Sequence, residues 1–158
     1  MAGAPPNPPV SGPRLFPLAL LLVCMGVMVI LDRLLPIAVI LSPPLTFLGW
    51  LPVVAGVAVV IAARFNFKRA ETTVMPFAEA SALVTDGMFA HSRNPMYTAF
   101  VAILAGTFIL LGTLSPVVVI PLFVWLIRAA VIAGEEKRLE KTFGAAYRDY
   151  KSRVRRWL

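Results

Sequence analysis

Residues 93–97, Arg-Asn-Pro-Met-Tyr, place a charge, a helix start and a phenol within one turn of chain. Proline disfavours helical geometry in the preceding residue and suits the first helical position, so a helix is expected to begin at Pro95 with Asn94 as its cap. Backbone donors of that turn, the helix dipole and the Arg93 guanidinium would then converge on a carboxylate or a phosphate. An Arg and a Tyr at this position would equally serve to anchor a membrane helix at the interface.

Two adjacent carboxylates, Glu135 and Glu136, follow a long apolar run. Neighbouring helical residues point about 100° apart, so at most one of them faces a pocket while the other meets water or a basic residue. Together with Arg93 they suit a ligand of both charges, such as an amino-acid moiety, with its carboxylate near Arg93 and an ammonium or sulfonium near Glu135. Arg128 lies seven residues earlier, on a similar helical face and deeper in the apolar run, where an ionisable residue either serves function or snorkels to the headgroups.

The composition indicates a membrane protein and excludes several other classes. The chain has 158 residues, of which 59% are hydrophobic, and a mean hydropathy of +0.82. One cysteine, Cys24, inside an apolar run, offers no disulfide framework and is expected to pack in the core. One histidine, His91, without ligands at metal-binding spacing predicts no metal site.

Four apolar runs are expected to cross the membrane as helices, which predicts an all-α integral membrane protein. They cover residues 15–31, 47–63, 95–111 and 116–133. No small-residue cleavage site follows the first run, so it is expected to be retained rather than removed as a signal peptide. The last two runs form an antiparallel hairpin, and Ala99, Ala102 and Gly106 give the third run a face of small residues that lets another helix approach closely.

Four spans place both termini on the same side of the membrane. Of the 15 Lys and Arg residues, only Arg33 would then lie on the opposite side, where it is expected to pair with Asp32. This bias predicts cytoplasmic termini and accounts for the net charge of +7 without nucleic acid, and it is compatible with a bacterial inner membrane. The expected divisions are a disordered Pro-rich tail (1–13), two membrane helices (14–63) and a functional region (64–158).

The C-terminal segment from Glu135 onward is charged but periodic. Its apolar residues recur at helical spacing, which predicts a cytoplasmic amphipathic helix, or a pair of helices broken at Gly144. Its basic residues form a face expected to lie on anionic headgroups: Lys151, Arg153, Arg155 and Arg156.

The ordered set of motifs resembles the superfamily of isoprenylcysteine carboxyl methyltransferases and phospholipid methyltransferases. The matching pieces, within residues 64–158, are Leu83-Val84-Thr85 with Gly87, residues 93–97, Glu135-Glu136, and Phe143-Gly144 with Tyr147 and Tyr150. The resemblance implies a site for S-adenosylmethionine closed by the tail helix and open to the membrane. It implies cofactor contacts at Ser81, Ala82, Leu83, Val84, Phe89, Arg93, Asn94, Pro95, Met96, Tyr97 and Glu135, and catalytic roles for Arg93 and Glu136.

Departures from the family pattern bear on the substrate. Asn94 replaces the His of the isoprenylcysteine enzymes and is closer to the eukaryotic phosphatidylethanolamine methyltransferases. Val131 stands where the eukaryotic isoprenylcysteine enzymes have an Arg for the substrate carboxylate, so we hypothesise that Arg128 contacts an anionic substrate group instead.

The predicted function is therefore methyl transfer from S-adenosylmethionine, with S-adenosylhomocysteine as product, to a phospholipid amine headgroup or another lipid. Methylation of a protein isoprenylcysteine carboxylate and a non-catalytic membrane scaffold of the same fold remain as alternatives. If the acceptor is an amine, Glu136 or Tyr97 would help to remove its proton. Membrane lipids are the expected partners, and no metal or nucleic acid is expected.

Overall fold

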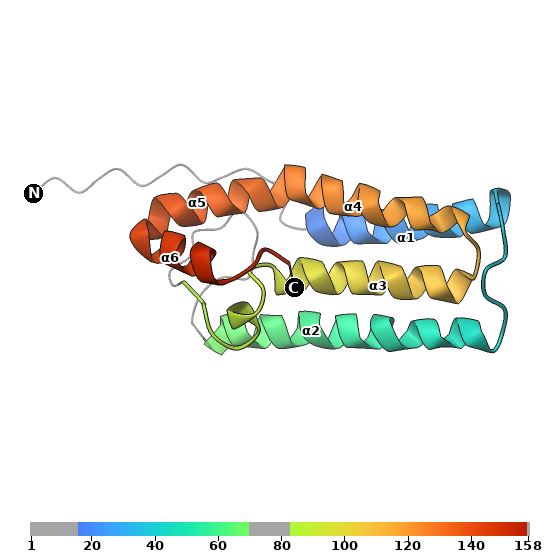
Figure 1. Cartoon of the computed structure of the whole chain (residues 1–158), viewed down its shortest axis with the longest axis horizontal. Coiled ribbons are helices and arrows are strands. Elements are labelled where there is room, and N and C mark those ends of the chain that lie inside the picture. The colour runs from blue at the N-terminus through green and yellow to red at the C-terminus, as the bar shows by residue number, and fades with distance from the viewer. Residues whose placement is uncertain (1–15, 70–82, 158) are drawn as a thin grey trace, which may run out of the picture.

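A computed structural model describes residues 16–69 and 83–157, and its long helices run side by side (Figure 1). The first three are α1 (Phe16–Leu34), α2 (Trp50–Arg69) and α3 (Pro95–Leu111). The fourth is one continuous helical path formed by η3 (Ser115–Val118), α4 (Val119–Ile127), the π-helical turn η4 (Arg128–Ile132) and α5 (Ala133–Phe143). Short 3₁₀ helices precede α2 (η1, Leu45–Gly49) and α3 (η2, Gly87–Ala90), and α6 (Ala145–Arg153) follows α5. Within these ranges the chain forms no named strand, which confirms the all-α prediction.

Three of the described helical segments are long and apolar enough to cross a membrane: Phe16–Leu34, Leu45–Phe65 and Ser115–Phe143. The shorter apolar helix Pro95–Leu111 has 17 residues, or about 26 Å at about 1.5 Å per residue, close to the hydrocarbon thickness of about 30 Å. The protein is therefore an integral membrane protein with three to four spans. Helices α3 and α4 form the predicted hairpin, with Gly112 in the left-handed conformation (φ +78°) where α3 ends.

The core lies where α1, α3 and α4 meet. Cys24 and Met28 of α1 pack with Leu104 of α3 and with Phe123 and Ile127 of α4, and the last four of these are fully buried. Cys24 is thus a small core residue, as expected. Large apolar side chains such as Leu22, Leu51 and Trp125 lie instead on the outside, where a bilayer would solvate them.

Small residues bring α2 and α3 together. A Cβ on Gly56 of α2 would lie 2.7 Å from the carbonyl oxygen of Ala99, and one on Gly106 would lie 2.5 Å from that of Gly49. The predicted small face of α3 therefore receives η1 and α2 through Ala99 and Gly106.

We expect Gly106→Ala to lower the free energy of unfolding by about 1–3 kcal/mol, because the added methyl group meets backbone atoms that cannot turn away. Thermal unfolding of the detergent-solubilised protein measures the effect. Gly26→Ala is the matched control, since a Cβ on Gly26 of α1 meets nothing within 4 Å. Equal melting temperatures for the two variants would contradict this account of the α2–α3 contact.

The helix that forms the fourth span is longer than the predicted span. The helix continues past Ala133 to Phe143 before Gly144 breaks it with a positive φ of 52°, and the C-terminal segment is a pair of helices, α5 and α6. At about 1.5 Å per residue, the 29 residues from Ser115 to Phe143 measure about 44 Å, which exceeds the hydrocarbon core. Helix α5 therefore extends beyond the bundle at the end where α3 begins (Figure 1). The predicted tail 1–13 lies outside the described residues.

Candidate active site

Helix α3 begins at Pro95, as predicted, but Asn94 does not cap it with its side chain. Its Nδ2 instead donates a hydrogen bond of 3.2 Å to the carbonyl oxygen of Arg156, and its backbone N–H bonds Ser92 Oγ at 3.2 Å. The expected cap is thus wrong for the side chain, because the C-terminal segment supplies a competing acceptor. The side chains of Ser92 and Asn94 are therefore tied to that segment, whereas the carbonyl oxygen of Asn94 still accepts from Thr98 in the first turn of α3.

The Glu pair at the start of α5 meets the 93–97 motif, although about 40 residues separate them in sequence. Tyr97 Oη donates a hydrogen bond to the Glu135 carboxylate and lies 3.1 Å from Oε1 and 3.2 Å from Oε2. Arg93 Nη1 lies 3.2 Å from Glu136 Oε1. As predicted, the two carboxylates point to different partners, one to a phenol and the other to an arginine.

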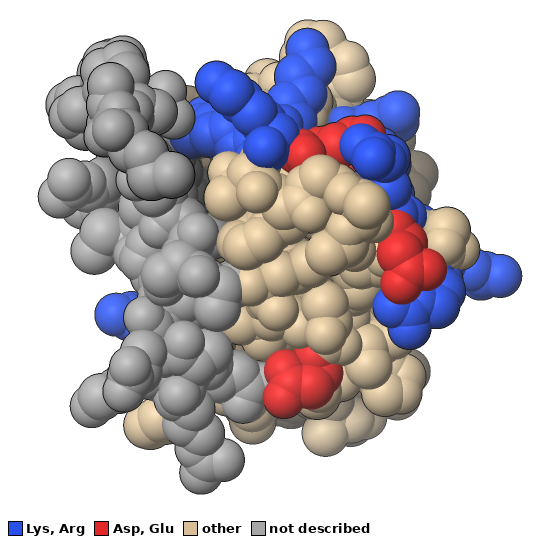
Figure 2. All heavy atoms as spheres, turned by 90° about the vertical axis from the view of Figure 1, so that its left-hand side faces the viewer, with Lys and Arg blue, Asp and Glu red and all other residues tan. Residues whose placement is uncertain are grey.

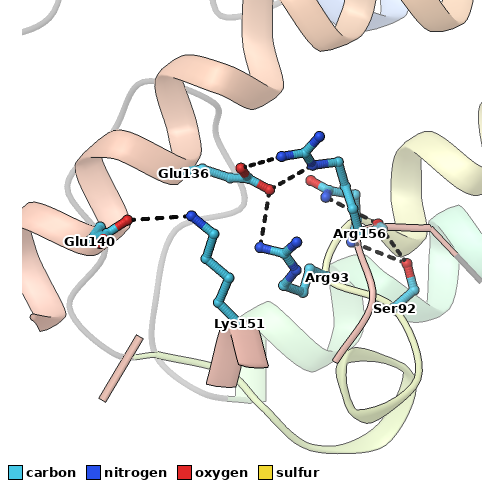
Figure 3. Close-up of polar contacts among 7 residues, drawn as sticks. Ser92, Arg93, Glu136, Glu140, Lys151 and Arg156 are labelled. Carbon is cyan, nitrogen blue, oxygen red and sulfur yellow. Dashed lines mark hydrogen bonds and ion pairs between the residues drawn. The ribbon is translucent and has the colours of Figure 1, made fainter. Parts of the chain in front are cut away.

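A second arginine binds Glu136 more fully than Arg93 does. Arg156 donates from Nε to Oε1 at 2.9 Å and from Nη2 to Oε2 at 2.8 Å, so that both carboxylate oxygens are engaged (Figure 3). The hydrogen bond to Glu136 raises the pKa of Arg156 above its usual value. This bidentate geometry is the strong form of an Arg–carboxylate contact. Arg156 was expected on the basic outer face, and its position here corrects that expectation.

Arg93 is buried with part of its hydrogen-bonding capacity unused. Its side chain is only 10% exposed, and its Nε and Nη1 have no hydrogen-bond partner among the described residues. Buried donors of a charged group are costly when left unpaired. The arrangement therefore favours an anionic group at Arg93 in addition to Glu136.

Two tyrosines of α6 close the site from the side. Tyr150 Oη donates to the carbonyl oxygen of Phe89 at 2.6 Å, and burial raises its pKa to about 12, so its proton stays in place. Tyr147 is 1% exposed and is hydrogen-bonded to Arg93. Its pKa is raised, first by burial and then by the charge of Glu136, while Arg93 opposes the shift. Both phenols therefore stay neutral near neutral pH and hold α6 against the site.

The comparison that decides the family is a match to a family model. Residues 44–146 match the model described as phospholipid methyltransferase. The chain belongs to the phospholipid methyltransferase family. It is also 36% identical over 72 residues to the protein-S-isoprenylcysteine O-methyltransferase of Schizosaccharomyces pombe. This alignment covers 46% of the chain but only 30% of the yeast protein, and no solved structure matches the chain significantly.

Several of the residues that the family resemblance indicates meet at this site. Arg93, Tyr97, Glu135 and Glu136 are brought into direct contact through the pairs described above. The other residues on or before α3 vary in exposure: Phe89, Asn94 and Pro95 are buried, whereas Leu83, Val84 and Met96 are half-buried. Ser81 and Ala82 lie outside the described residues. In this member of the phospholipid methyltransferase family, Arg156 and Ser92 join the site without having been predicted.

Arg128 takes part in neither the Arg93–Glu136 contact nor the Tyr97–Glu135 contact. It is exposed and lines an open pocket of about 390 Å³ that also borders Glu136 and Arg156. A regular α-helix would turn it toward the side of Glu135, seven residues on, but the π-helical turn at Arg128–Ile132 widens the helix and shifts the register. The expected alignment of Arg128 with Glu135 is therefore wrong, and Arg128 lines the same pocket as Glu136 instead.

That pocket is rich in positive charge. Its lining residues are Arg128, Ala133, Glu136, Lys137, Glu140, Lys151 and Arg156. Glu140 is paired with Lys151 at 3.5 Å and Glu136 with Arg156, whereas no ion pair of Arg128 or Lys137 is found within the described ranges. Figure 2 shows Lys and Arg side chains gathered around this end of the bundle. The pocket therefore favours an anionic group beside the candidate active site.

Proposed function

We propose that the chain is a membrane methyltransferase that moves a methyl group from S-adenosylmethionine to a lipophilic acceptor. The observation that carries the proposal is the contact of two distant segments, which puts a buried, incompletely bonded Arg93 beside the Glu135–Tyr97 pair. Family membership supports the reaction type. The excess of Lys and Arg around this end supports a cytoplasmic site with both termini on that side, as in a bacterial inner membrane.

The residues present fit the methionine portion of this cofactor, which is a zwitterion. Arg93 would hold its carboxylate, and Glu135 would face its cationic part, with Phe89, Asn94, Met96 and Tyr97 around it. When bound, S-adenosylmethionine supplies an activated methyl group on a sulfonium. The protein's part is then to align the acceptor with that methyl group and to exclude water. For an amine acceptor, Glu136 or Tyr97 would assist in removing the proton.

The proposal is tested by adding S-adenosylhomocysteine to the detergent-solubilised protein and measuring thermal unfolding. At a ligand concentration of about 100 Kd, the expected stabilisation is about 2.7 kcal/mol. Methylthioadenosine, which lacks the amino-acid moiety, should stabilise the protein less. No shift with either compound would favour the non-catalytic scaffold.

The acceptor class requires a second experiment, in which membranes are incubated with the protein and methyl-labelled S-adenosylmethionine. We propose a phospholipid amine headgroup or another lipid, supported by the family match, and expect base-stable label in the lipid extract. The yeast relative, whose name specifies isoprenylcysteine O-methylation, favours a second candidate. That activity would appear as a base-labile methyl ester on a prenylcysteine acceptor.

Arg128 is proposed as a substrate residue, because its pocket would receive the phosphate of a lipid headgroup. We expect Arg128→Gln to raise KM for the lipid acceptor about tenfold, equivalent to one charge-assisted hydrogen bond, and to leave donor affinity unchanged. Steady-state kinetics with lipid in mixed micelles measures both constants. Arg148→Gln on α6 is the control, since Arg148 is exposed and does not line the pocket. Unchanged kinetics in Arg128→Gln would remove Arg128 from the substrate site.

A further inference from the structure

The segment that follows α6, residues 154–157, is bound to the start of α3 along its backbone. The carbonyl oxygen of Arg155 accepts from the backbone N–H of Arg93 at 2.9 Å. The carbonyl oxygen of Arg156 accepts from Asn94 Nδ2 at 3.2 Å and from Ser92 Oγ at 3.3 Å. Three hydrogen bonds to consecutive residues fix this segment beside the 93–97 motif, and its backbone position determines where the Arg156 side chain can reach.

The Arg156 side chain and Arg93 compete for the same carboxylate. Glu136 offers two oxygens, and Arg156 binds both of them at 2.8 and 2.9 Å. Arg93 reaches only Oε1, at 3.2 Å, and this contact lacks hydrogen-bond geometry, because Nη1 and Nε of Arg93 remain without a hydrogen-bond partner in the described part of the chain. Figure 3 shows the two guanidinium groups approaching Glu136, one from the C-terminal segment and the other from the start of α3.

We propose that Arg156 is a positioning residue that keeps Glu136 from binding Arg93 bidentately, so that Arg93 retains donors for the carboxylate of the methyl donor. This inference rests on the proposed function, since it assigns a purpose to donors that a cofactor carboxylate would use. In the absence of Arg156, Glu136 is free to turn both oxygens to Arg93. The guanidinium of Arg93 would then be occupied by the Glu136 carboxylate, and the methyl donor would have to break that ion pair before it could bind.

A role limited to holding the chain end predicts something different. In that case, Glu136→Gln alone would weaken donor binding, because it breaks the ion pair through which Arg156 holds the C-terminal segment. In the proposed role, Arg156 acts only through the Glu136 carboxylate. In the proposed role, Glu136→Gln alone does not weaken donor binding, so the two single variants and the double variant together separate these alternatives.

The experiment measures the Kd of S-adenosylhomocysteine by calorimetry on the full chain in detergent. Arg156→Gln is expected to raise Kd about tenfold. In the Glu136→Gln background, where no carboxylate competes for Arg93, adding Arg156→Gln is expected to change Kd less than about threefold. Arg153→Gln is the matched control, because Arg153 pairs with the exposed Asp149 and is itself 69% exposed. Its Kd should equal that of the wild type.

Three results would overturn the assignment. The first is an Arg156→Gln variant that binds as the wild type does, and the second is an equal loss of affinity from Arg156→Gln in both backgrounds. The third is a wild-type protein that does not bind S-adenosylhomocysteine, which would overturn the proposed function together with this inference. If Arg156→Gln alone fails to fold, the comparison of Glu136→Gln with the double variant decides the question, since a loss of more than about threefold there contradicts the proposal.

Discussion

Replacing Arg93 with Ala is expected to weaken binding of S-adenosylmethionine at least about tenfold and to lower methyl transfer at subsaturating donor by the same factor. The reason is that Arg93 is the buried cation with unused donors beside the Glu pair. Hydrogen bonds to charged groups contribute about 1.5–3 kcal/mol each, and about 1.4 kcal/mol corresponds to a factor of ten in affinity. Arg93→Lys should recover only part of the loss, because an ammonium keeps the charge without the planar fork.

The Arg93→Ala variant should still fold, since Glu136 keeps its bidentate partner Arg156 and is not left as an uncompensated buried charge. Thermal unfolding without ligand checks this point, and calorimetry with S-adenosylmethionine measures the affinity. Arg33→Ala is the control, because Arg33 is 78% exposed and lies in the last turn of α1, far from Arg93 along the chain. A near wild-type affinity in Arg93→Ala would remove the cofactor carboxylate from this position.

The parts of the fold that the sequence predicts well are those set by local signals. Pro95 and Gly112 mark both ends of α3, because proline suits a first turn and glycine adopts the positive φ at which this helix stops. The helix of the fourth span continues past Ala133, where polarity changes but nothing breaks the helix. The break comes at Gly144, which the sequence also marks.

Contacts between helices and the directions of side chains are harder to predict from the sequence. The small face of α3 predicts that some helix approaches closely, but Gly49 and Gly56 become its partners only in the folded bundle. The π-helical turn carries no local signature in the sequence, and a regular helix gives the wrong direction for Arg128.

In the candidate site, too, some contacts follow from the sequence and others depend on the tertiary fold. Residues 93–97 and the Glu pair are separated by the two spans of the α3–α4 hairpin, which return the chain to the same end of the bundle. The contact between these two segments could therefore be predicted. The position of Arg156 could not be predicted, because the helical spacing of apolar residues continues through Val154 and Trp157 although α6 ends at Arg153. Its direction depends on backbone hydrogen bonds with residues 92–94, which are a property of the fold.

Replacing Glu135 with Gln is expected to reduce the affinity for S-adenosylmethionine at least about tenfold, because the change removes the negative charge proposed to face the cationic part of the donor. The substitution keeps nearly the same shape, and the Gln side-chain oxygen can still accept from the Tyr97 hydroxyl that now donates to Glu135. The free protein should therefore keep its fold and its unfolding temperature. The loss would then report charge rather than damage to the site.

Measuring S-adenosylhomocysteine with the same variant identifies which cation Glu135 faces. The product keeps the ammonium but has lost the sulfonium charge, so a loss confined to S-adenosylmethionine assigns the sulfonium, and equal losses assign the ammonium. Glu140→Gln is the control, since Glu140 lies on the same helix, is about one-third exposed and pairs only with Lys151 among the ion pairs of the described residues. Unchanged affinity for both compounds in Glu135→Gln would show that the Tyr97–Glu135 pair serves to join α3 to α5 and that the donor binds elsewhere.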